Sequence, residues 1–327
     1  MRILVCIHSQ FAMWNIPVTH VERLRRVFPH HEFLHAIDDE HGVALIADAD
    51  AAFMGTIQRE QLAAAAKLRW VHSPAAGVGG MLFPEMLASP IVITNSRGMS
   101  ADTIGEHVIA VTLALFRRLP HAFRSQQVRE WAQDAIGLAG HRSLSGSHVL
   151  IVGLGAIGGA VAGRMHALGA HVVGIRRHGA SGVPVEGVAM IETPARLHAL
   201  LPHADVVVIS APHTRDTRKF IGRAELEAMR PDAILVNVSR GQLVDEGVLI
   251  AALEANRIGG AALDVFNDEP LPQDSPFWRL PNVLVTPHTS GFRSDHWDAA
   301  TALFSENLRR YEAGQPLLNI VDKAAGY

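Results

Sequence analysis

Short apolar runs alternate with stretches of helical periodicity along almost the whole chain, and this alternation restricts the fold more than any other feature. Runs typical of strands lie at residues 2–7, 31–37, 51–55, 69–73 and 91–95, and then at 148–153, 171–175, 205–210, 233–238, 260–265 and 282–287. Helices are expected at residues 18–28, 101–118, 157–168 and 298–311. Strands that alternate with helices predict an α/β fold with parallel, doubly wound sheets.

The two series of runs predict two sheets, with a boundary near residue 100. The stretch from 120 to 146 between them is less regular and is not assigned to an element. Two helices have a clear apolar face. The apolar face of the helix at 18–28 is formed by Val21, Leu24 and Phe28. The apolar face of the helix at 101–118 is formed by Ile104, Val108, Val111, Leu115 and Leu119.

Composition excludes several classes of protein. The formal net charge of −3 gives no basic surface for nucleic acid or an anionic membrane. No apolar run reaches the roughly 18 residues that a membrane span needs, and the N-terminal run is too short for a signal peptide. The single cysteine, Cys6, fits a reducing compartment and is expected as a buried residue of the first strand. A cytoplasmic protein is expected.

The segment HEFLH at 31–35 matches the H-E-x-x-H pattern of zinc proteases. That chemistry needs a helix, which places His31 and His35 on one face. The segment directly follows Pro29 and falls where a strand is expected, and residues four apart in a strand are separated by about 13 Å. A metalloprotease is therefore rejected, and no metal ligands are predicted.

A glycine-rich turn follows the strand at 148–153. Gly153, Gly155 and Gly158 form G-x-G-x-x-G, and Ala156 and Ile157 open the next helix. Such glycines allow a tight turn and close approach of the backbone, and the helix N-terminus presents N–H groups to a pyrophosphate. The strand–turn–helix context predicts a dinucleotide site rather than a packing turn or a methyltransferase-type nucleotide site.

The residues after the next strand indicate which dinucleotide binds. An NAD site usually has an acidic residue roughly twenty positions beyond the glycines, where it holds the ribose 2′-OH. This chain has Arg176 and Arg177 there, followed by His178. Guanidinium groups would bind the 2′-phosphate of NADP. NADP(H) is therefore the expected cofactor and NAD(H) the alternative.

Three later segments carry polar side chains at the ends of strands. They are Asn237–Gly241, which contains Arg240; Asp264–Pro270, which contains Glu269; and Pro287–Gly291, which contains His288. The carboxyl ends of parallel strands form the usual ligand crevice of such sheets. There an arginine binds a carboxylate, and a histidine oriented by a glutamate exchanges a proton with a carbonyl oxygen.

With these motifs in this order, the chain resembles the D-isomer-specific 2-hydroxyacid dehydrogenases over nearly its full length. The resemblance implies that Arg240 binds the substrate carboxylate and carbonyl, that His288 donates or accepts the proton, and that Glu269 is its partner. The absence of an acid at Arg176 is similar to the NADP-dependent glyoxylate and hydroxypyruvate reductases. The further cofactor contacts that the resemblance implies are Thr103, Val238, Asp264 and Gly291.

The resemblance also has consequences for the first sheet and for assembly. Gly77, Val78 and Gly79 resemble the loop whose amides hold the substrate carboxylate. The implied organisation is a flavodoxin-like substrate domain at 1–99, a Rossmann domain at 100–293, and a segment at 294–327 that returns to the first domain, with a cleft between the domains. A homodimer is expected, with 120–146 as its arm. Roles for Trp131 near a substrate and for His213 near the cofactor are left open.

The activity that these implications describe is hydride transfer between NADPH and a small 2-oxo acid or D-2-hydroxy acid. Two alternatives are retained. One is a dinucleotide-sensing binding protein that resembles corepressors of this fold. The other is a formate or phosphite dehydrogenase on the same scaffold. The identity of the acid is not predicted.

Overall fold

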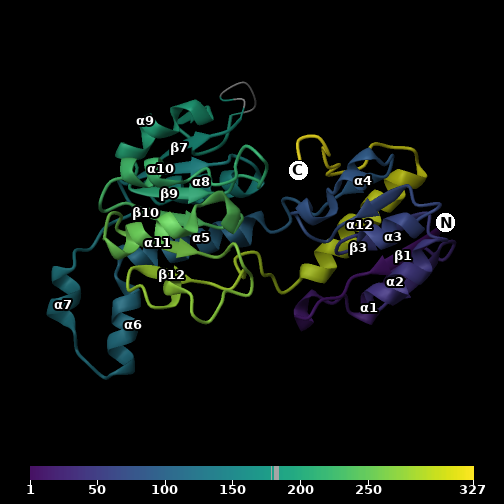
Figure 1. The fold of residues 1–327 in the computed structure, drawn as a ribbon, viewed down its shortest axis with the longest axis horizontal. Coiled ribbons are helices and arrows are strands. Elements are labelled where there is room, and N and C mark those ends of the chain that lie inside the picture. Colours follow the sequence, from purple (N-terminus) through teal and green to yellow (C-terminus); the bar gives the residue numbers. More distant parts are fainter. Residues whose placement is uncertain (178, 180–183) are drawn as a thin grey trace. The chain divides into compact units, whose positions relative to one another are not determined.

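The computed structural model describes residues 1–177, 179 and 184–327, which form two compact units. Unit 1 comprises Met1–Met99 and Arg293–Tyr327, and unit 2 comprises Ser100–Phe292 (Figure 1). The chain thus re-enters unit 1 at Arg293, one residue before the expected position. His178, which follows the two arginines after the predicted strand at 171–175, lies outside the described residues.

Unit 1 contains a five-stranded parallel sheet with strand order β2-β1-β3-β4-β5. The expected runs all form strands, each slightly shorter than its run. The strands are β1 (Arg2–Cys6), β2 (Glu32–Ala36), β3 (Ala51–Met54), β4 (Trp70–His72) and β5 (Val92–Thr94). The helices are α1 (Val18–Val27), α2 (Asp39–Ile46), α3 (Arg59–Ala64), α4 (Pro84–Ala88) and α12 (His296–Glu312).

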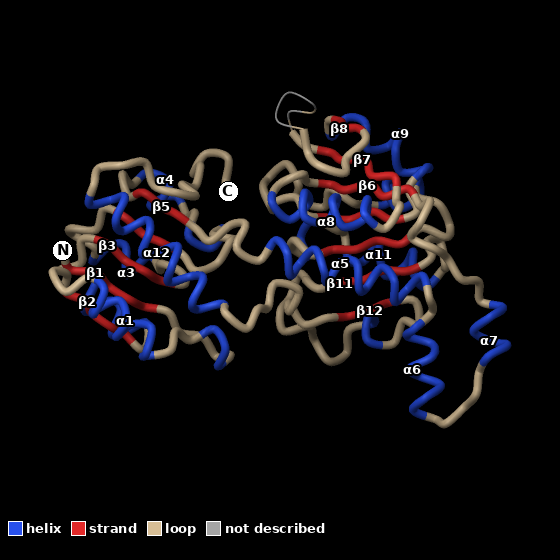
Figure 2. The backbone as a smooth tube through the Cα atoms, turned by 180° about the vertical axis from the view of Figure 1, so that it is seen from behind, coloured by secondary structure: helices blue, strands red, loops and turns tan. Residues whose placement is uncertain are grey.

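Helices cover both faces of this sheet (Figure 2). Alternating side chains of the strands pack on these two helical layers. Ile3 and Val5 point to the layer that contains α1 and α12, whereas Leu4 and Cys6 point to the layer that contains α2 and α4. This two-residue period is that of an extended strand covered on both faces. Cys6 is buried as expected, and burial raises the pKa of its thiol to about 11.

Unit 2 contains a seven-stranded parallel sheet with strand order β12-β11-β10-β9-β6-β7-β8. The strands are β6 (His148–Val152), β7 (His171–Ile175), β8 (Met190–Glu192), β9 (Val206–Ile209), β10 (Ile234–Asn237), β11 (Gly260–Leu263) and β12 (Val283–Val285). The helices are α5 (Ala101–Phe116), α6 (Leu119–Gln127), α7 (Gln133–Leu138), α8 (Ala156–Ala167), α9 (Leu197–Leu200), α10 (Arg223–Ala228) and α11 (Glu246–Glu254).

This sheet also separates two apolar layers. Along β9, Val206 and Val208 face α5 and α8, while Val207 and Ile209 face α9, α10 and α11. The chain moves outward from β6 to β8 and then returns to β9 on the other side of β6. The strand order therefore reverses between β6 and β9, which is where ligands bind in open parallel sheets.

Two expectations for unit 2 need correction. Residues 120–146 are not simply irregular, because α6 and α7 lie there and project from the body of the unit (Figures 1 and 2). Ser125 is the only buried residue of α6 and α7 has none, so neither helix has the apolar stripe that predicts helices. Leu119 belongs to α6 rather than to the face of α5, because Arg118 between them has a left-handed φ of 58°.

The short strand β8 was not expected, since it has only three residues and none is buried. The segment HEFLH lies in β2 and the residue before it, in agreement with the rejection of a helical zinc motif. Within the described residues, no helix combines the length and apolar character required to cross a bilayer.

Candidate active site

The glycine-rich turn connects β6 to α8 at the point where the strand order reverses. Gly153 has φ 104°, and a Cβ there would lie 2.4 Å from the amide nitrogen of Ala211, just beyond β9. A Cβ on Gly158 would lie 2.0 Å from the carbonyl oxygen of Gly153. Neither position tolerates a side chain, because the turn is tight and the first turn of α8 packs directly on it.

Gly155 has a different environment. It is the residue before α8, and a Cβ built there meets no described atom within 4 Å. The N-terminus of the 12-residue helix α8 therefore faces open space through a residue with no side chain. An anion such as a pyrophosphate fits this space, where it meets the free N–H groups of Ala156 and Ile157.

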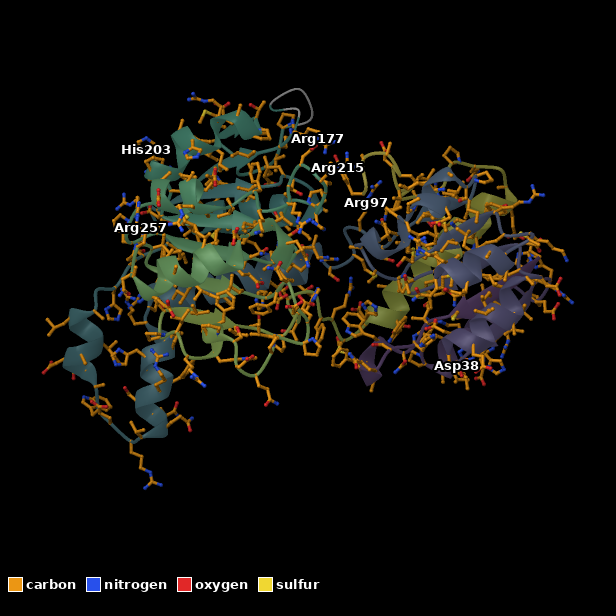
Figure 3. All side chains as sticks on the ribbon, viewed as in Figure 1. Asp38, Arg97, Arg177, His203, Arg215 and Arg257 are labelled. Carbon is orange, nitrogen blue, oxygen red and sulfur yellow. The ribbon has the colours of Figure 1, made fainter. Side chains whose placement is uncertain are left out.

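Arg176 and Arg177 follow β7 on the same edge of the sheet. The Arg176 side chain donates from Nε to the carbonyl oxygen of Gly179, and Nη2 of Arg177 lies 3.8 Å from a carboxylate oxygen of Asp216. Arg215 and Arg177 are neighbours at this corner (Figure 3). Arg215, in the loop after β9, was not singled out from the sequence because it is distant from β7 along the chain.

His288 and Glu269 form a hydrogen-bonded pair. Nδ1 of His288 lies 2.7 Å from Oε2 of Glu269, and Oε1 of Glu269 accepts from the amide of Phe266 at 2.9 Å. Burial tends to raise the pKa of Glu269, but the hydrogen bonds from His288 and Phe266 and the charges of His288 and Arg240 hold it below its usual value. The carboxylate is therefore ionised at neutral pH and orients the imidazole through Nδ1, which leaves Nε2 for a substrate.

The backbone at His288 is held in an uncommon conformation. Its φ is 54°, which costs on the order of 1 kcal/mol for a residue other than glycine. Its amide donates to the carbonyl oxygen of Asp264 at 2.9 Å, and the buried carboxylate of Asp264 accepts from Thr286, Thr289 and Ser290. Asp264 thereby holds the loop that carries His288, a function that the sequence did not indicate.

The guanidinium of Arg240 is close enough to Glu269 to be affected by its charge. Burial lowers the pKa of its guanidinium, and the charge of Glu269 opposes that change. Nη1 donates to the carbonyl oxygen of Ser239 at 2.6 Å, and Asn237 donates through Nδ2 to the carbonyl oxygen of Arg240 at 3.0 Å. The structure thus brings Arg240, Glu269 and His288 together at the carboxyl ends of β10, β11 and β12.

The remaining predicted cofactor residues of unit 2 lie on the same side. Val238 directly follows β10 and is buried, Gly291 is in the loop after β12, and Thr103 in α5 donates to the carbonyl oxygen of Ser100 at 3.1 Å. A Cβ at Gly291 would lie 3.6 Å from Cβ of Ser100, so this loop lies against the start of α5. Their contacts with a cofactor stay predictions.

His107 of α5 is not among the residues predicted from the sequence. Its Nε2 lies 3.3 Å from Oγ1 of Thr286, which donates to Asp264 at 2.6 Å. Burial lowers the pKa of His107 against the opposing charge of Asp264. The position of His107 four residues after Thr103, on the same helical face, was the available signal.

The predicted substrate loop belongs to unit 1. It follows β4, with Gly77 and Gly79 exposed and Val78 buried in the core of that unit. Asn95 anchors the loop by donating to the carbonyl oxygen of Ala76 at 2.6 Å. Among the described residues, the amides of Gly77, Val78 and Gly79 have no acceptor, so they are available to an anion.

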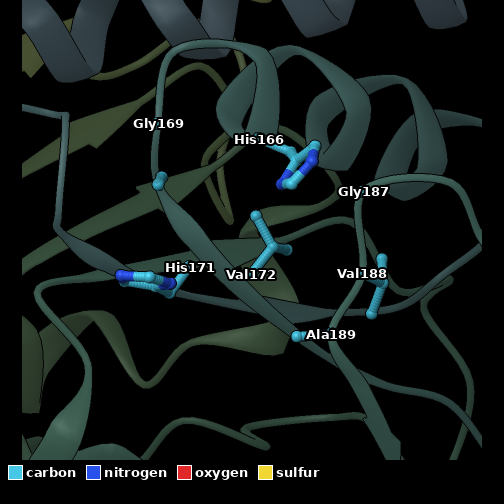
Figure 4. A pocket seen from close by; sticks show the side chains of 8 residues that line it. His166, Gly169, His171, Val172, Gly187, Val188 and Ala189 are labelled. Carbon is cyan, nitrogen blue, oxygen red and sulfur yellow. The ribbon is translucent and has the colours of Figure 1, made fainter.

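A pocket of about 370 Å³ lies elsewhere in unit 2 (Figure 4). It is lined by the end of α8, by His171 and Val172 at the start of β7, and by Gly187–Ala189. The candidate catalytic side chains follow strand ends, whereas this pocket lies at a strand start. It is therefore at the opposite edge of the sheet from the candidate site.

Unit 2 as described offers a helix N-terminus open to an anion, an arginine beside a glutamate, and a histidine that this glutamate orients. These are the parts needed to bind a dinucleotide and to exchange a proton with a substrate oxygen. Residues 109–290 match the family model described as D-isomer specific 2-hydroxyacid dehydrogenase, NAD binding domain.

Two kinds of relatives extend the match. The chain is 33% identical over 278 residues to a glyoxylate reductase of Korarchaeum cryptofilum, with 82% of this chain and 80% of the relative covered. It is 31% identical over 286 residues to a D-3-phosphoglycerate dehydrogenase of Methanocaldococcus jannaschii. The match covers 85% of this chain but only 52% of that longer protein.

Among solved structures, the fold is similar to an NADPH-dependent glyoxylate/hydroxypyruvate reductase of Sinorhizobium meliloti in complex with NADP and sulfate. The TM-score is 0.84 at 27% sequence identity, with 100% of this chain and 99% of that chain covered. The motifs, the two parallel sheets and these relatives agree. The chain belongs to the D-isomer-specific 2-hydroxyacid dehydrogenase family and is an NAD(P)-dependent oxidoreductase.

Proposed function

We propose that the protein reduces a small 2-oxo acid to the D-2-hydroxy acid with NADPH, reversibly, in the manner of a glyoxylate/hydroxypyruvate reductase. The observation that carries this proposal is the 2.7 Å contact between His288 and Glu269 beside Arg240. The glyoxylate reductase relative and the NADP-bound reductase structure support the substrate class and the cofactor.

When bound, the nicotinamide supplies the hydride that reaches the carbonyl carbon. Arg240 binds the carboxylate and the carbonyl oxygen of the acid, which orients the carbonyl. As negative charge develops on that oxygen, Nε2 of His288 donates a proton to it, and the O–H bond of the product forms. Glu269 stabilises the imidazolium before transfer and fixes its ring. In unit 1, the amides of Gly77–Gly79 are proposed to bind a substrate carboxylate.

The preference for NADPH rests on the corner after β7. Arg177 and Arg215 are exposed there. The residues that directly follow β7 are Arg176 and Arg177, where an acidic residue would repel a 2′-phosphate. A guanidinium on a phosphate contributes about 1.5–3 kcal/mol. We expect Arg177→Ser to lower kcat/KM for NADPH by roughly tenfold to a hundredfold with little effect on NADH.

Steady-state kinetics with both coenzymes measure this preference. Arg223→Ser is the matched control, since Arg223 is an exposed arginine of the same unit at the start of α10. If the wild-type protein prefers NADH, or if Arg177→Ser lowers both activities equally, the role given to the arginines is wrong.

A panel of substrates tests the proposed reaction. Glyoxylate, hydroxypyruvate, pyruvate and phenylpyruvate are each supplied with NADPH and with NADH, and formate and phosphite are supplied with NADP⁺ and NAD⁺. The proposal predicts the highest kcat/KM for glyoxylate or hydroxypyruvate with NADPH. Turnover of formate or phosphite alone would indicate the other dehydrogenase class. Cofactor binding without turnover would indicate a dinucleotide-sensing protein.

A further inference from the structure

Two histidines and a glutamate meet in unit 1, in a cluster that the proposed reaction does not use. His30 and His31 lie in the turn between α1 and β2, and Glu312 is the last residue of α12. These segments are 282 positions apart along the chain. All three residues belong to unit 1, whose core is covered on one face by α1 and α12.

The ligand atoms of these side chains converge on one point. Nε2 of His30 lies 2.8 Å from Oε1 of Glu312, and Nε2 of His31 lies 3.0 Å from the same oxygen. All three atoms lie within 4.8 Å of one another. Two ligands of a tetrahedral zinc ion, with bonds of about 2.0 Å, are separated by roughly 3.3 Å. Small side-chain movements therefore make room for the ion.

His31 is the buried member of the cluster. Its side chain is 4% exposed, and its ring stacks on Phe28 with a centroid distance of 6.2 Å. Although Nε2 is near Glu312, it forms no hydrogen bond of acceptable geometry within the described structure. Nδ1 lies 3.4 Å from the amino nitrogen of Met1, so the ring is held with Nε2 toward Glu312. A buried ring nitrogen without a hydrogen-bond partner is typical of a site that holds an ion or a water molecule.

The carboxylate is available to a cation. The Glu312 side chain is 30% exposed, and its Oε1 faces both imidazoles. The nearby Arg309 lies over the Phe28 ring at 5.3 Å from its centroid. Within the described residues, the two imidazoles are the ion-pair partners of Glu312.

We propose that His30, His31 and Glu312 bind one Zn²⁺ ion that ties the end of α12 to the turn before β2. Two imidazoles and a carboxylate form a ligand set that zinc accepts, with water as the fourth ligand. The His30 side chain is 59% exposed, which leaves room for that water. The site shares His31 with the HEFLH segment, but its other ligands are different from Glu32 and His35, and it acts independently of the dehydrogenase chemistry.

The cation stabilises unit 1 because the site exists only in the folded chain. An ion that binds the native state alone raises the free energy of unfolding in proportion to the logarithm of its concentration over Kd. In unit 1, α12 supplies Phe304, whose ring stacks on Phe53 at 4.5 Å and on Trp70 at 5.4 Å. Fixing the last turn of α12 therefore fixes a helix that carries part of the core.

A second cluster serves as the control. Cys6, His8 and Asp39 also place ligand atoms within 4.8 Å of one another. The thiol of Cys6 is buried there and donates to the carbonyl oxygen of Asp38 at 3.8 Å. Zinc is therefore expected at the histidine pair rather than at Cys6.

The test is titration of the full-length, chelator-treated protein with ZnCl₂ by calorimetry, together with thermal unfolding with and without zinc. His30→Ala and Glu312→Gln alter exposed or half-exposed side chains, so both variants are expected to fold, which circular dichroism checks. His8→Gln is the matched control. Cobalt(II) absorption reports whether the bound ion is four-coordinate.

We expect one zinc ion per wild-type chain and a higher Tm in its presence. His30→Ala and Glu312→Gln should raise Kd by more than about tenfold, the smallest effect expected even from outer-shell changes, and remove the Tm shift. His8→Gln should behave as wild type. The proposal is wrong if wild-type protein binds no zinc, if both site variants retain the affinity, or if His8→Gln alone abolishes it.

Discussion

At the scale of single residues, the contacts with Asp264 explain why a left-handed backbone persists at His288. The φ of 54° at His288 is maintained by the bond from its amide to Asp264 and by the Asp264 carboxylate, which holds the neighbouring amides. Strained conformations that the surroundings over-determine are common at active sites. Asp264 therefore holds the backbone of His288, while Glu269 orients its imidazole.

Glu269→Gln should lower kcat for 2-oxo acid reduction by roughly a hundredfold, because the imidazolium loses its carboxylate partner. Since the pKa of Glu269 is depressed, its stabilising effect is complete above the ordinary carboxyl pKa and is lost as pH falls through the depressed value. In the wild-type protein, the fall in rate at low pH should therefore occur below the ordinary pKa range of glutamate. In the variant, the pH–rate profile should shift toward lower pH.

Rates measured from pH 4 to pH 10 with NADPH and glyoxylate test this prediction. Glu227→Gln is a suitable control, since Glu227 is an exposed glutamate of α10. An unchanged pH profile in Glu269→Gln would show that the carboxylate does not assist His288.

At the scale of elements, β4 and β5 share a buried polar pair. Nδ1 of His72 lies 2.7 Å from Oγ1 of Thr94, which also accepts from the indole of Trp70 at 2.8 Å. Burial lowers the pKa of His72 to about 3. The unfolded chain therefore binds one more proton than the folded chain between pH 3 and about 6.5. Stability from His72 is complete above that range and falls as the pH decreases through it.

Replacing His72 by Gln should remove this dependence. Between pH 6 and pH 4, the slope of unfolding free energy against pH should decrease by about 1.4 kcal/mol per unit. Urea unfolding at several pH values measures the slope, which is separate from any overall loss of stability in the variant. The exposed His203 provides the control variant His203→Gln (Figure 3). Equal slopes in wild type and His72→Gln would contradict the assignment.

The arm formed by α6 and α7 exposes several large apolar side chains. Trp131 and Leu138 are 89% and 88% exposed, and Phe123 and Val128 are also exposed. Apolar side chains in this quantity on a projecting segment mark an interaction surface. We propose that the arm forms a homodimer. The double variant Trp131→Ser/Leu138→Ser should sediment as a monomer, while Trp278→Ser, an exposed tryptophan outside the arm, should leave the dimer intact.

Sedimentation velocity of the three proteins decides the question. A wild-type monomer, or a double variant that remains dimeric, would contradict the proposed role of the arm.

The two kinds of helix show what the sequence could predict. In α1 and α5 an apolar stripe packs on a sheet, so the period of Val21 and Leu24, or of Ile104 and Val108, indicates the helix. The arm helices bury almost nothing within the chain, and their sequence lacks that period. β8 was missed for the same reason, because it lies at a sheet edge and buries no residue.

At the scale of the whole molecule, the sequence indicated two parallel sheets but not their strand order. Local patterns identify strands, whereas the reversal between β6 and β9 depends on contacts between distant residues. The motifs were sufficient to nominate Gly153, Arg240, Glu269 and His288. The loop-holding role of Asp264 and its link through Thr286 to His107 were not visible, because those contacts join three elements.

We propose that His288 is the proton donor for the reduction of a 2-oxo acid by NADPH. The most direct measurement compares wild type and His288→Asn for NADPH oxidation with glyoxylate and hydroxypyruvate, together with NADPH binding by fluorescence titration. We expect kcat to fall by about 10²- to 10⁴-fold, with an unchanged Kd for NADPH. A variant that turns over at the wild-type rate would contradict it.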